Sequence, residues 1–138
     1  MSSPHEAFRE EAYELLTDLE SSLLELEERP ADLEIVGAVF RAMHTIKGSG
    51  AMFGFDDISS FTHDVETVYD LVRNGELTVT GELVSLSLAA RDQIKAMLDA
   101  TCGGDPCDLV RTEELRAAFR ALIPVQEGAP AAASASAK

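Results

Sequence analysis

One histidine of this chain, His44, stands among residue types that suit chemistry on an anion that carries phosphate. The surrounding run, residues 40–51, reads Phe-Arg-Ala-Met-His-Thr-Ile-Lys-Gly-Ser-Gly-Ala. Arg41 and Lys47 stand three residues either side of the histidine, and no acid occurs over residues 35–55. In a chain with a net charge of −14, this stretch is a positive region around one imidazole, which favours an anionic substrate.

A neutral imidazole is a nucleophile near pH 7, because the unperturbed pKa of a histidine is about 6.5. Attack on phosphorus needs a free lone pair on one ring nitrogen, and a hydrogen-bond acceptor at the other nitrogen fixes that tautomer. The helix predicted after residue 56 offers acceptors in a polar row, namely Ser59, His63, Glu66 and Asp70. Lys47, with Arg41 nearby, can balance the charge of a transferred phosphoryl group.

Two glycines, Gly48 and Gly50, follow the histidine inside a helical period, where each costs about 1 kcal/mol relative to alanine. Close approach by another backbone is the usual compensation, so we expect one here. At about 100° per residue, Lys47, Gly48 and Ala51 share the face of His44. The small residues are therefore expected to leave access for a partner: Gly48, Ser49, Gly50 and Ala51.

Apolar residues recur every three or four positions along most of the chain, which predicts amphipathic helices. No segment alternates with a period of two for more than a few residues, so we expect no strands. The predicted helices span about residues 6–28, 33–52, 56–74, 81–102 and 109–122. The sequence thus predicts an all-α fold, an antiparallel four-helix bundle with a fifth, C-terminal accessory helix.

Local signals set the expected helix boundaries. Asp32 and Asp56 are predicted to N-cap the second and third helices, because a carboxylate can accept hydrogen bonds from unpaired backbone amides. Asn74 and Gly75 are predicted to end the third helix. The second helix carries two apolar rows, which predicts a central place in the bundle.

Length and composition bound the domain organisation and the class of function. We expect one helical domain over residues 1–122, and a flexible linker or tail over residues 123–138 that once led to a further part of a longer protein. The net charge of −14 argues against nucleic acid and anionic membranes as partners. No apolar run is long enough to span a membrane and no signal peptide is present, so we expect a cytoplasmic, monomeric domain.

Signatures of other catalytic and metal sites are missing from the sequence. It contains no P-loop, no dinucleotide-binding glycine fingerprint, no H-E-x-x-H and no G-x-S-x-G. His63 and Glu66 stand three apart, but in reverse order and without a second copy, so we expect no metal site and no cofactor. Cys102 and Cys107 form a lone C-x4-C, which predicts two reduced thiols near a loop.

The run His-Thr-Ile-Lys-Gly-Ser-Gly-Ala-Met-Phe-Gly-Phe resembles the H-x-[IL]-K-G signature of histidine-containing phosphotransfer (HPt) domains. The resemblance is strongest to the phosphotransfer domains of chemotaxis histidine kinases of the CheA type. It covers about residues 8–122 and includes a second His-x-x-Glu nineteen residues after the first histidine. Mild departures from the family pattern occur at Thr45, Ser49 and Met52.

The resemblance implies a role for each residue of the motif. His44 would be phosphorylated, Lys47 would be the motif lysine, Glu66 would hydrogen-bond the imidazole, and His63 would join that polar network. The domain would receive the phosphoryl group from an ATP-binding kinase domain of a parent histidine kinase. It would pass the group to an aspartate of a CheY- or CheB-like response-regulator receiver domain, as a carrier without an ATP-binding core and not as a complete enzyme.

Two other classes of function stay open on the residues alone. A bundle with a glycine-lined face could dock a partner helix without any chemistry. A bundle could also hold a metal or a haem between His44 and His63, although no further ligand set accompanies these two residues.

Overall fold

The computed structural model describes residues 4–101, 103 and 107–123. Its five helices are α1 (Pro4–Glu28), α2 (Leu33–Met52), α3 (Asp56–Arg73), α4 (Gly81–Thr101) and α5 (Leu109–Leu122). Over these described ranges there is no strand. The predicted all-α class is confirmed, and the helix boundaries lie within about two residues of those expected from the apolar pattern.

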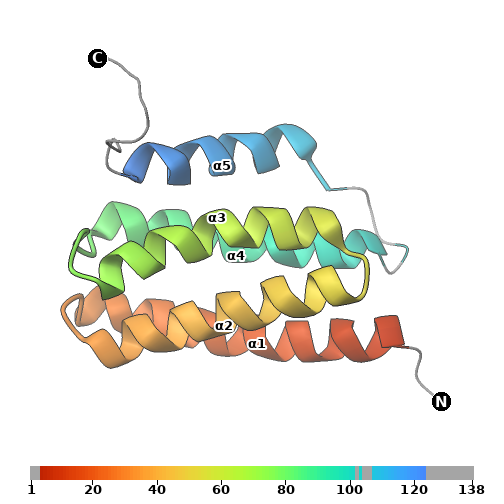
Figure 1. Ribbon diagram of the computed structural model, residues 1–138, viewed down its shortest axis with the longest axis horizontal. Helices are drawn as coiled ribbons and strands as arrows, with labels where there is room; N and C mark the ends of the chain where they lie inside the picture. The colour runs from red at the N-terminus through yellow and green to blue at the C-terminus, as the bar shows by residue number, and fades with distance from the viewer. Residues whose placement is uncertain (1–3, 102, 104–106, 124–138) are drawn as a thin grey trace.

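The first four helices form a ring in which each helix packs against two others of the ring (Figure 1). In this ring α2 contacts α1 and α3, and α4 contacts α3 and α1. Short loops join successive helices, which therefore run in opposite directions. Outside the ring, α5 covers α3 and α4, so the predicted four-helix bundle with an accessory helix is confirmed.

The prediction of a central place for α2 is wrong, because α2 contacts two helices whereas α3 and α4 each contact three. α2 has two packing faces, because it packs against both α1 and α3. Val39 and Ile46 are buried in these faces, whereas Phe40 and Ala42 are half-buried. The wide apolar arc of α2 therefore arises because the helix packs against two neighbours, α1 and α3, and carries the half-buried ring of Phe40. Other helices do not enclose α2 on all sides.

Apolar side chains from all five helices share one core. Each large apolar side chain that is fully buried stabilises the fold by about 1.5–3 kcal/mol. One polar pair lies within the core, where the buried hydroxyls of Tyr69 and Ser87 share a 2.6 Å hydrogen bond. The largest fully buried apolar side chains include Phe8, Leu16, Met43, Phe61, Ile94 and Phe119.

The N-cap prediction succeeds at α2 and fails at α3, whereas the predicted end of α3 is confirmed, because Asn74 is its C-cap and Gly75 has a φ of +81°. The Asp32 carboxylate accepts hydrogen bonds from the backbone amides of Glu34 at 3.0 Å and Ile35 at 3.4 Å, as expected. At α3 the N-cap residue is Phe55, and no side chain caps the helix. Asp56 instead stands in the first turn, where a carboxylate favours the positive end of the helix dipole.

The loop between α2 and α3 explains why Asp56 does not cap α3. Gly54 has a φ of +87°, which lets the chain reverse within three residues. The amide of Phe55 then donates to the carbonyl of Gly50 at 2.7 Å, and its own carbonyl accepts from Ser59 at 3.0 Å. Phe53 is therefore the C-cap of α2, and Phe55 takes the N-cap position of α3 that the sequence had assigned to Asp56.

The accessory helix α5 is fixed by polar contacts that the sequence pattern did not indicate. Gln93 on α4 donates to the hydroxyl of Thr112 at 2.8 Å and to the carbonyl of Asp108 at 3.1 Å. On the α3 side, Arg116 Nε lies 2.8 Å from a carboxylate oxygen of Asp64. These contacts anchor α5 on both helices that it covers.

Two expectations concern parts of the chain that lie outside the described residues, namely Cys102 and the linker or tail over residues 124–138. The second cysteine of the pair, Cys107, is a free, half-buried thiol. None of the described helices is long and apolar enough to cross a lipid bilayer.

Candidate functional site

The candidate site lies where the second half of α2 faces α3. His44 is carried on α2 with 62% of its side chain exposed, and Glu66 faces it from α3 with only 8% exposed. His44 Nδ1 lies 2.5 Å from Glu66 Oε2, a hydrogen bond between residues 22 positions apart in the chain. The acceptor that the polar row was predicted to supply is therefore Glu66.

Two more side chains reach the other oxygen of the same carboxylate. Lys47 Nζ lies 2.6 Å from Glu66 Oε1, and His63 Nδ1 lies 3.6 Å from that atom. Burial by itself raises the pKa of Glu66, but hydrogen bonds and charge from Lys47 and His44 outweigh the burial, so the pKa of Glu66 is lowered. The carboxylate therefore stays ionised at neutral pH.

This geometry decides which nitrogen of His44 can react. With the proton of a neutral imidazole on Nδ1, facing the carboxylate, the lone pair must be on Nε2. Within the described part of the chain, Nε2 has no hydrogen-bond partner. Nε2 of His44 is thus the nucleophilic nitrogen, while the hydrogen bond from Nδ1 to Glu66 restrains the other side of the ring.

One side-chain hydrogen bond and one close backbone approach between α2 and α3 hold these side chains in register. Ser59 Oγ on α3 donates to the carbonyl of Lys47 on α2 at 2.9 Å. A Cβ added at Gly50 would lie 3.4 Å from the carbonyl oxygen of Phe55 and 3.6 Å from the amide nitrogen of Ser59. The expected close approach of another backbone is therefore found at Gly50.

The same expectation is wrong for Gly48, because a Cβ added there would meet nothing within 4 Å. Gly48 is exposed and lies one turn after His44. The absence of a side chain at Gly48 leaves open space beside the imidazole, and packing inside the protein does not require a glycine there. Nearby, Ser49 is half-buried and Ala51 is exposed.

Two of the predicted residues lie apart from the carboxylate cluster. Arg41 is exposed, and its guanidinium points away from His44 toward Gly37, which is one helical turn before Arg41. A Cβ added at Gly37 would lie 3.2 Å from Arg41 Nη1. Asp70 is exposed and pairs with Arg73 at 3.8 Å. The cluster thus consists of His44, Glu66, Lys47 and His63.

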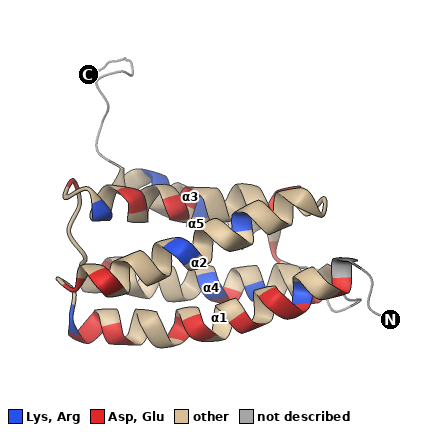
Figure 2. Ribbon diagram, turned by 60° about the horizontal axis from the view of Figure 1, so that its bottom comes forward, with Lys and Arg blue, Asp and Glu red and all other residues tan. Residues whose placement is uncertain are grey.

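Figure 2 shows how the charged residues are distributed over the helices, with basic residues on α2 and also on α4 and α5. Acidic residues recur along α1, whereas the basic residues of α2, Arg41 and Lys47, stand on either side of His44. Among the described residues, no group of three or more histidine, cysteine or acidic side chains is placed to hold a metal ion.

Sequence reasoning missed one aromatic contact of the site. The ring of Phe40 lies nearly parallel to the imidazole of His44, with an interplanar angle of 13° and 6.0 Å between centroids. Arg73 Cζ lies 4.1 Å from the centroid of the same phenyl ring. The spacing of four residues between Phe40 and His44 on one helix was a signal that could have found the first contact.

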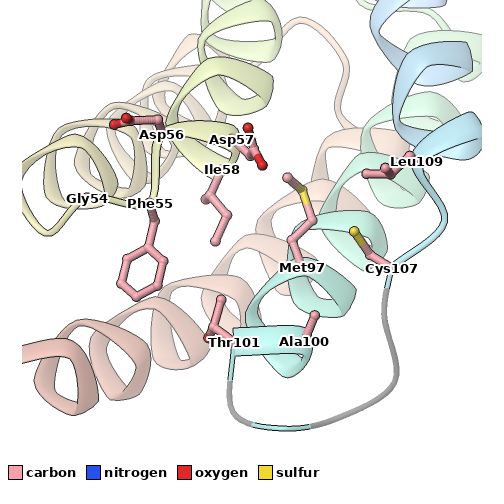
Figure 3. Close-up of a pocket in the computed structure, with 10 residues that line it drawn as sticks. All are labelled: Gly54, Phe55, Asp56, Asp57, Ile58, Met97, Ala100, Thr101, Cys107 and Leu109. Carbon is pink, nitrogen blue, oxygen red and sulfur yellow. The ribbon is translucent and has the colours of Figure 1, made fainter.

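A separate hollow of about 470 Å³ lies between the loop after α2, the end of α4 and the start of α5 (Figure 3). Its lining includes Phe55, Ile58, Met97, Cys107 and Leu109. No histidine, lysine or arginine lines this hollow, so it adds nothing to the chemistry of the cluster around Glu66.

An exposed imidazole hydrogen-bonded to a carboxylate, on a four-helix bundle, matches the family that the motif indicated. The family model for the Hpt domain matches residues 5–104, and the chain belongs to this family. The predicted membership is confirmed.

Within the family, the chain is similar to CheA proteins. It is 38% identical over 126 residues to the chemotaxis protein CheA of Treponema pallidum, and the match covers 91% of this chain but only 15% of that protein. It also resembles the CheA phosphotransferase domain from Thermotoga maritima, with a TM-score of 0.70 and 35% identity over 74% of this chain and 99% of that chain.

A third similar protein was solved with a partner. It is the phosphorylated P1 domain of CheA3 in complex with CheY6 from R. sphaeroides. The TM-score is 0.75 and the identity 27%, over 89% of this chain and 100% of that chain.

Proposed function

We propose that this domain carries a phosphoryl group on Nε2 of His44, between an ATP-binding kinase domain and an aspartate of a response-regulator receiver domain. The observation that supports the proposal most directly is the 2.5 Å hydrogen bond between His44 Nδ1 and Glu66 Oε2. It leaves the exposed Nε2 with the lone pair that attack on phosphorus requires.

In the first step, the Nε2 lone pair forms a bond to the γ-phosphorus of ATP, and the bond from that phosphorus to the β–γ bridging oxygen breaks. ADP leaves with the bonding electrons. The proton on Nδ1 stays in place, so the phosphorylated ring carries a positive charge that the Glu66 carboxylate balances. Lys47 keeps that carboxylate ionised and adds a positive charge close to the phosphoryl group.

In the second step, a carboxylate oxygen of the receiver aspartate attacks the same phosphorus, and the bond between Nε2 and phosphorus breaks. The electron pair returns to Nε2, which regenerates the neutral imidazole. No proton needs to move through the protein in either step. His63 assists by its place beside the second oxygen of Glu66, and Arg41 by attracting the phosphate-bearing partner.

The partners in this proposal follow from the similar proteins and from the motif. The relatives are chemotaxis CheA proteins of which this chain spans a small part, which supports a parent kinase with a separate ATP-binding domain. The similar P1 domain of CheA3 forms a complex with CheY6, which supports a CheY- or CheB-like receiver. The domain would act in the cytoplasm, where ATP is available, as a monomeric carrier over residues 1–122.

The test is transfer of label from γ-³²P-ATP through a CheA kinase core added in trans. Wild-type protein should acquire a label that is stable to base and labile to acid, and His44→Gln should acquire none. His63→Gln removes the other exposed imidazole of the cluster and should still be labelled. Labelling of His44→Gln at the wild-type level would refute the proposal, and an unlabelled wild-type protein would favour a docking module without chemistry.

A further inference from the structure

We infer that Phe40 is a positioning residue for His44, and that Arg73 holds Phe40 in place from the neighbouring helix. This inference rests on the proposed phosphotransfer function of His44. Nothing in the signature around the histidine assigns a role to either side chain.

The hydrogen bond to Glu66 does not by itself fix the imidazole. It restrains one atom, Nδ1, whereas the ring can still tilt about the line of that bond. With 62% of its side chain exposed, His44 has little protein packed around it to prevent such motion. A second restraint on the plane of the ring is needed if Nε2 is to keep one direction.

Phe40 supplies a flat surface against that plane. It precedes His44 by one helical turn, and the two rings lie within 13° of parallel with 6.0 Å between their centroids. Phe40 is itself half-buried and packs against the core, so its own ring has less freedom than the imidazole. A tilt of the imidazole toward the preceding turn of α2 would press it against the phenyl ring of Phe40.

Arg73 completes the arrangement from the other helix. Its guanidinium carbon lies 4.1 Å from the centroid of Phe40, a distance typical of a cation–π contact. The weak 3.8 Å pair with Asp70 leaves the guanidinium free to stack on the ring. Since Arg73 is the last residue of α3, the stack joins the end of α3 to the reactive face of α2.

The stack also suits the phosphorylated state of the site. With a proton on Nδ1 and phosphorus on Nε2, the imidazole is a cation, and the face of a phenyl ring attracts cations. Phe40 is therefore expected to affect the chemical step more than the binding of either partner.

The test compares phosphorylation kinetics of the 138-residue protein with those of Phe40→Leu, at varied concentrations of the domain and a fixed kinase core. We expect kcat to fall by about tenfold while KM for the domain changes by less than twofold. Phe40→Tyr keeps the aromatic face and should stay within twofold of the wild type in both constants. Phe53→Leu is the matched control, because Phe53 is another half-buried aromatic ring that contacts Phe8 and not His44.

Proton NMR of the same proteins gives a readout that loss of packing alone would not produce. The ring-current shift on the His44 ring protons should be lost in Phe40→Leu and kept in Phe40→Tyr. Phe40→Met serves as a second variant should Phe40→Leu fail to fold. Arg73→Gln should lower kcat in the same direction by about twofold to threefold, and an unchanged kcat would remove Arg73 from the inference.

An unchanged kcat in folded Phe40→Leu or Phe40→Met, or an equal loss in Phe53→Leu, would overturn the role of Phe40. Failure of the inference is distinguishable from failure of the proposed function. Phosphotransfer at His44 fails if His44→Gln is labelled like the wild type or if the wild type acquires no label, whatever the Phe40 variants do.

Discussion

Glu66 and His44 share a hydrogen bond between side chains of opposite exposure, since the carboxylate is 8% exposed and the imidazole 62%. Water therefore competes little for the carboxylate, while a partner protein can reach the reacting ring. The oxygen that His44 does not use is occupied by Lys47, at 2.6 Å. One buried acid thus orients the imidazole and binds the nearest cation.

Glu66→Gln is expected to slow phosphorylation while leaving the bundle folded. A hydrogen bond to a charged group contributes about 1.5–3 kcal/mol, which corresponds to roughly a tenfold to hundredfold loss of rate. Glu66→Ala should be at least as slow, because it removes the acceptor as well as the charge. The measurement is the initial rate of phosphohistidine formation, with circular dichroism to confirm helicity.

Glu76→Gln removes an exposed carboxylate just after α3 and serves as the control for Glu66→Gln. Its rate should match that of the wild type. Equal rates for Glu66→Gln and the wild type would remove Glu66 from the mechanism.

Acid should destabilise the wild type through Glu66. Because the pKa of this carboxyl is lowered in the folded protein, its ion pairs add stability that is fully present above the ordinary value of 4.5 and is lost as pH falls through the lowered folded value. Urea unfolding at pH 7, 5, 4 and 3 should show the difference between the wild type and Glu66→Gln shrinking below pH 4.5. A difference that stays constant over this range would contradict the assignment.

Gly48 is expected to separate stability from function. Gly48→Ala should raise the free energy of unfolding by about 0.5–1 kcal/mol, since alanine favours the helix and its Cβ meets nothing within 4 Å. Gly48→Met should also fold, but its side chain would cover the space beside His44 and slow transfer to a receiver domain by about tenfold or more.

Ala121→Met places the same side chain at an exposed position on α5, which does not contact α2. This control should transfer phosphate at the wild-type rate. Equal transfer rates for Gly48→Met and Ala121→Met would show that partners do not use the open space at Gly48.

Arg41 is expected to act at a distance, because its guanidinium lies beside Gly37 and not at the imidazole. Arg41→Gln should lower the association rate with a phosphate-bearing partner by about twofold to fivefold at low salt. The difference should vanish at high ionic strength, where the Debye length is short. The measurement is stopped-flow association over a salt series, with Arg111→Gln on α5 as the control. A loss of association rate in Arg41→Gln that persisted at high salt would contradict this role.

Sequence periodicity was sufficient for the helices of this protein, because each buries one or two apolar stripes that recur at helical spacing. It was not sufficient for the start of α3. There the loop at Gly54 and the backbone of Phe55 set the boundary, and Asp56 only resembles a cap in sequence.

The contacts of the candidate site also divide into those that the sequence could predict and those that it could not. The contact of His44 with Glu66 was predicted from a motif and from a polar row on the next helix. The contact of Arg73 with Phe40 depends on the register between two helices, and no local pattern encodes that register. The stack of Phe40 on His44 lay within reach, because positions four apart on a helix are neighbours.

Residues 53–55 are the only link needed between the two helices that carry every side chain assigned a role at His44. The helical hairpin over residues 33–73 thus contains the whole reactive arrangement, and α1, α4 and α5 serve as its scaffold. Substitutions on the exposed faces of that scaffold touch none of the side chains assigned a role at His44. For the same reason, the hairpin is a unit that protein engineers could graft onto another bundle.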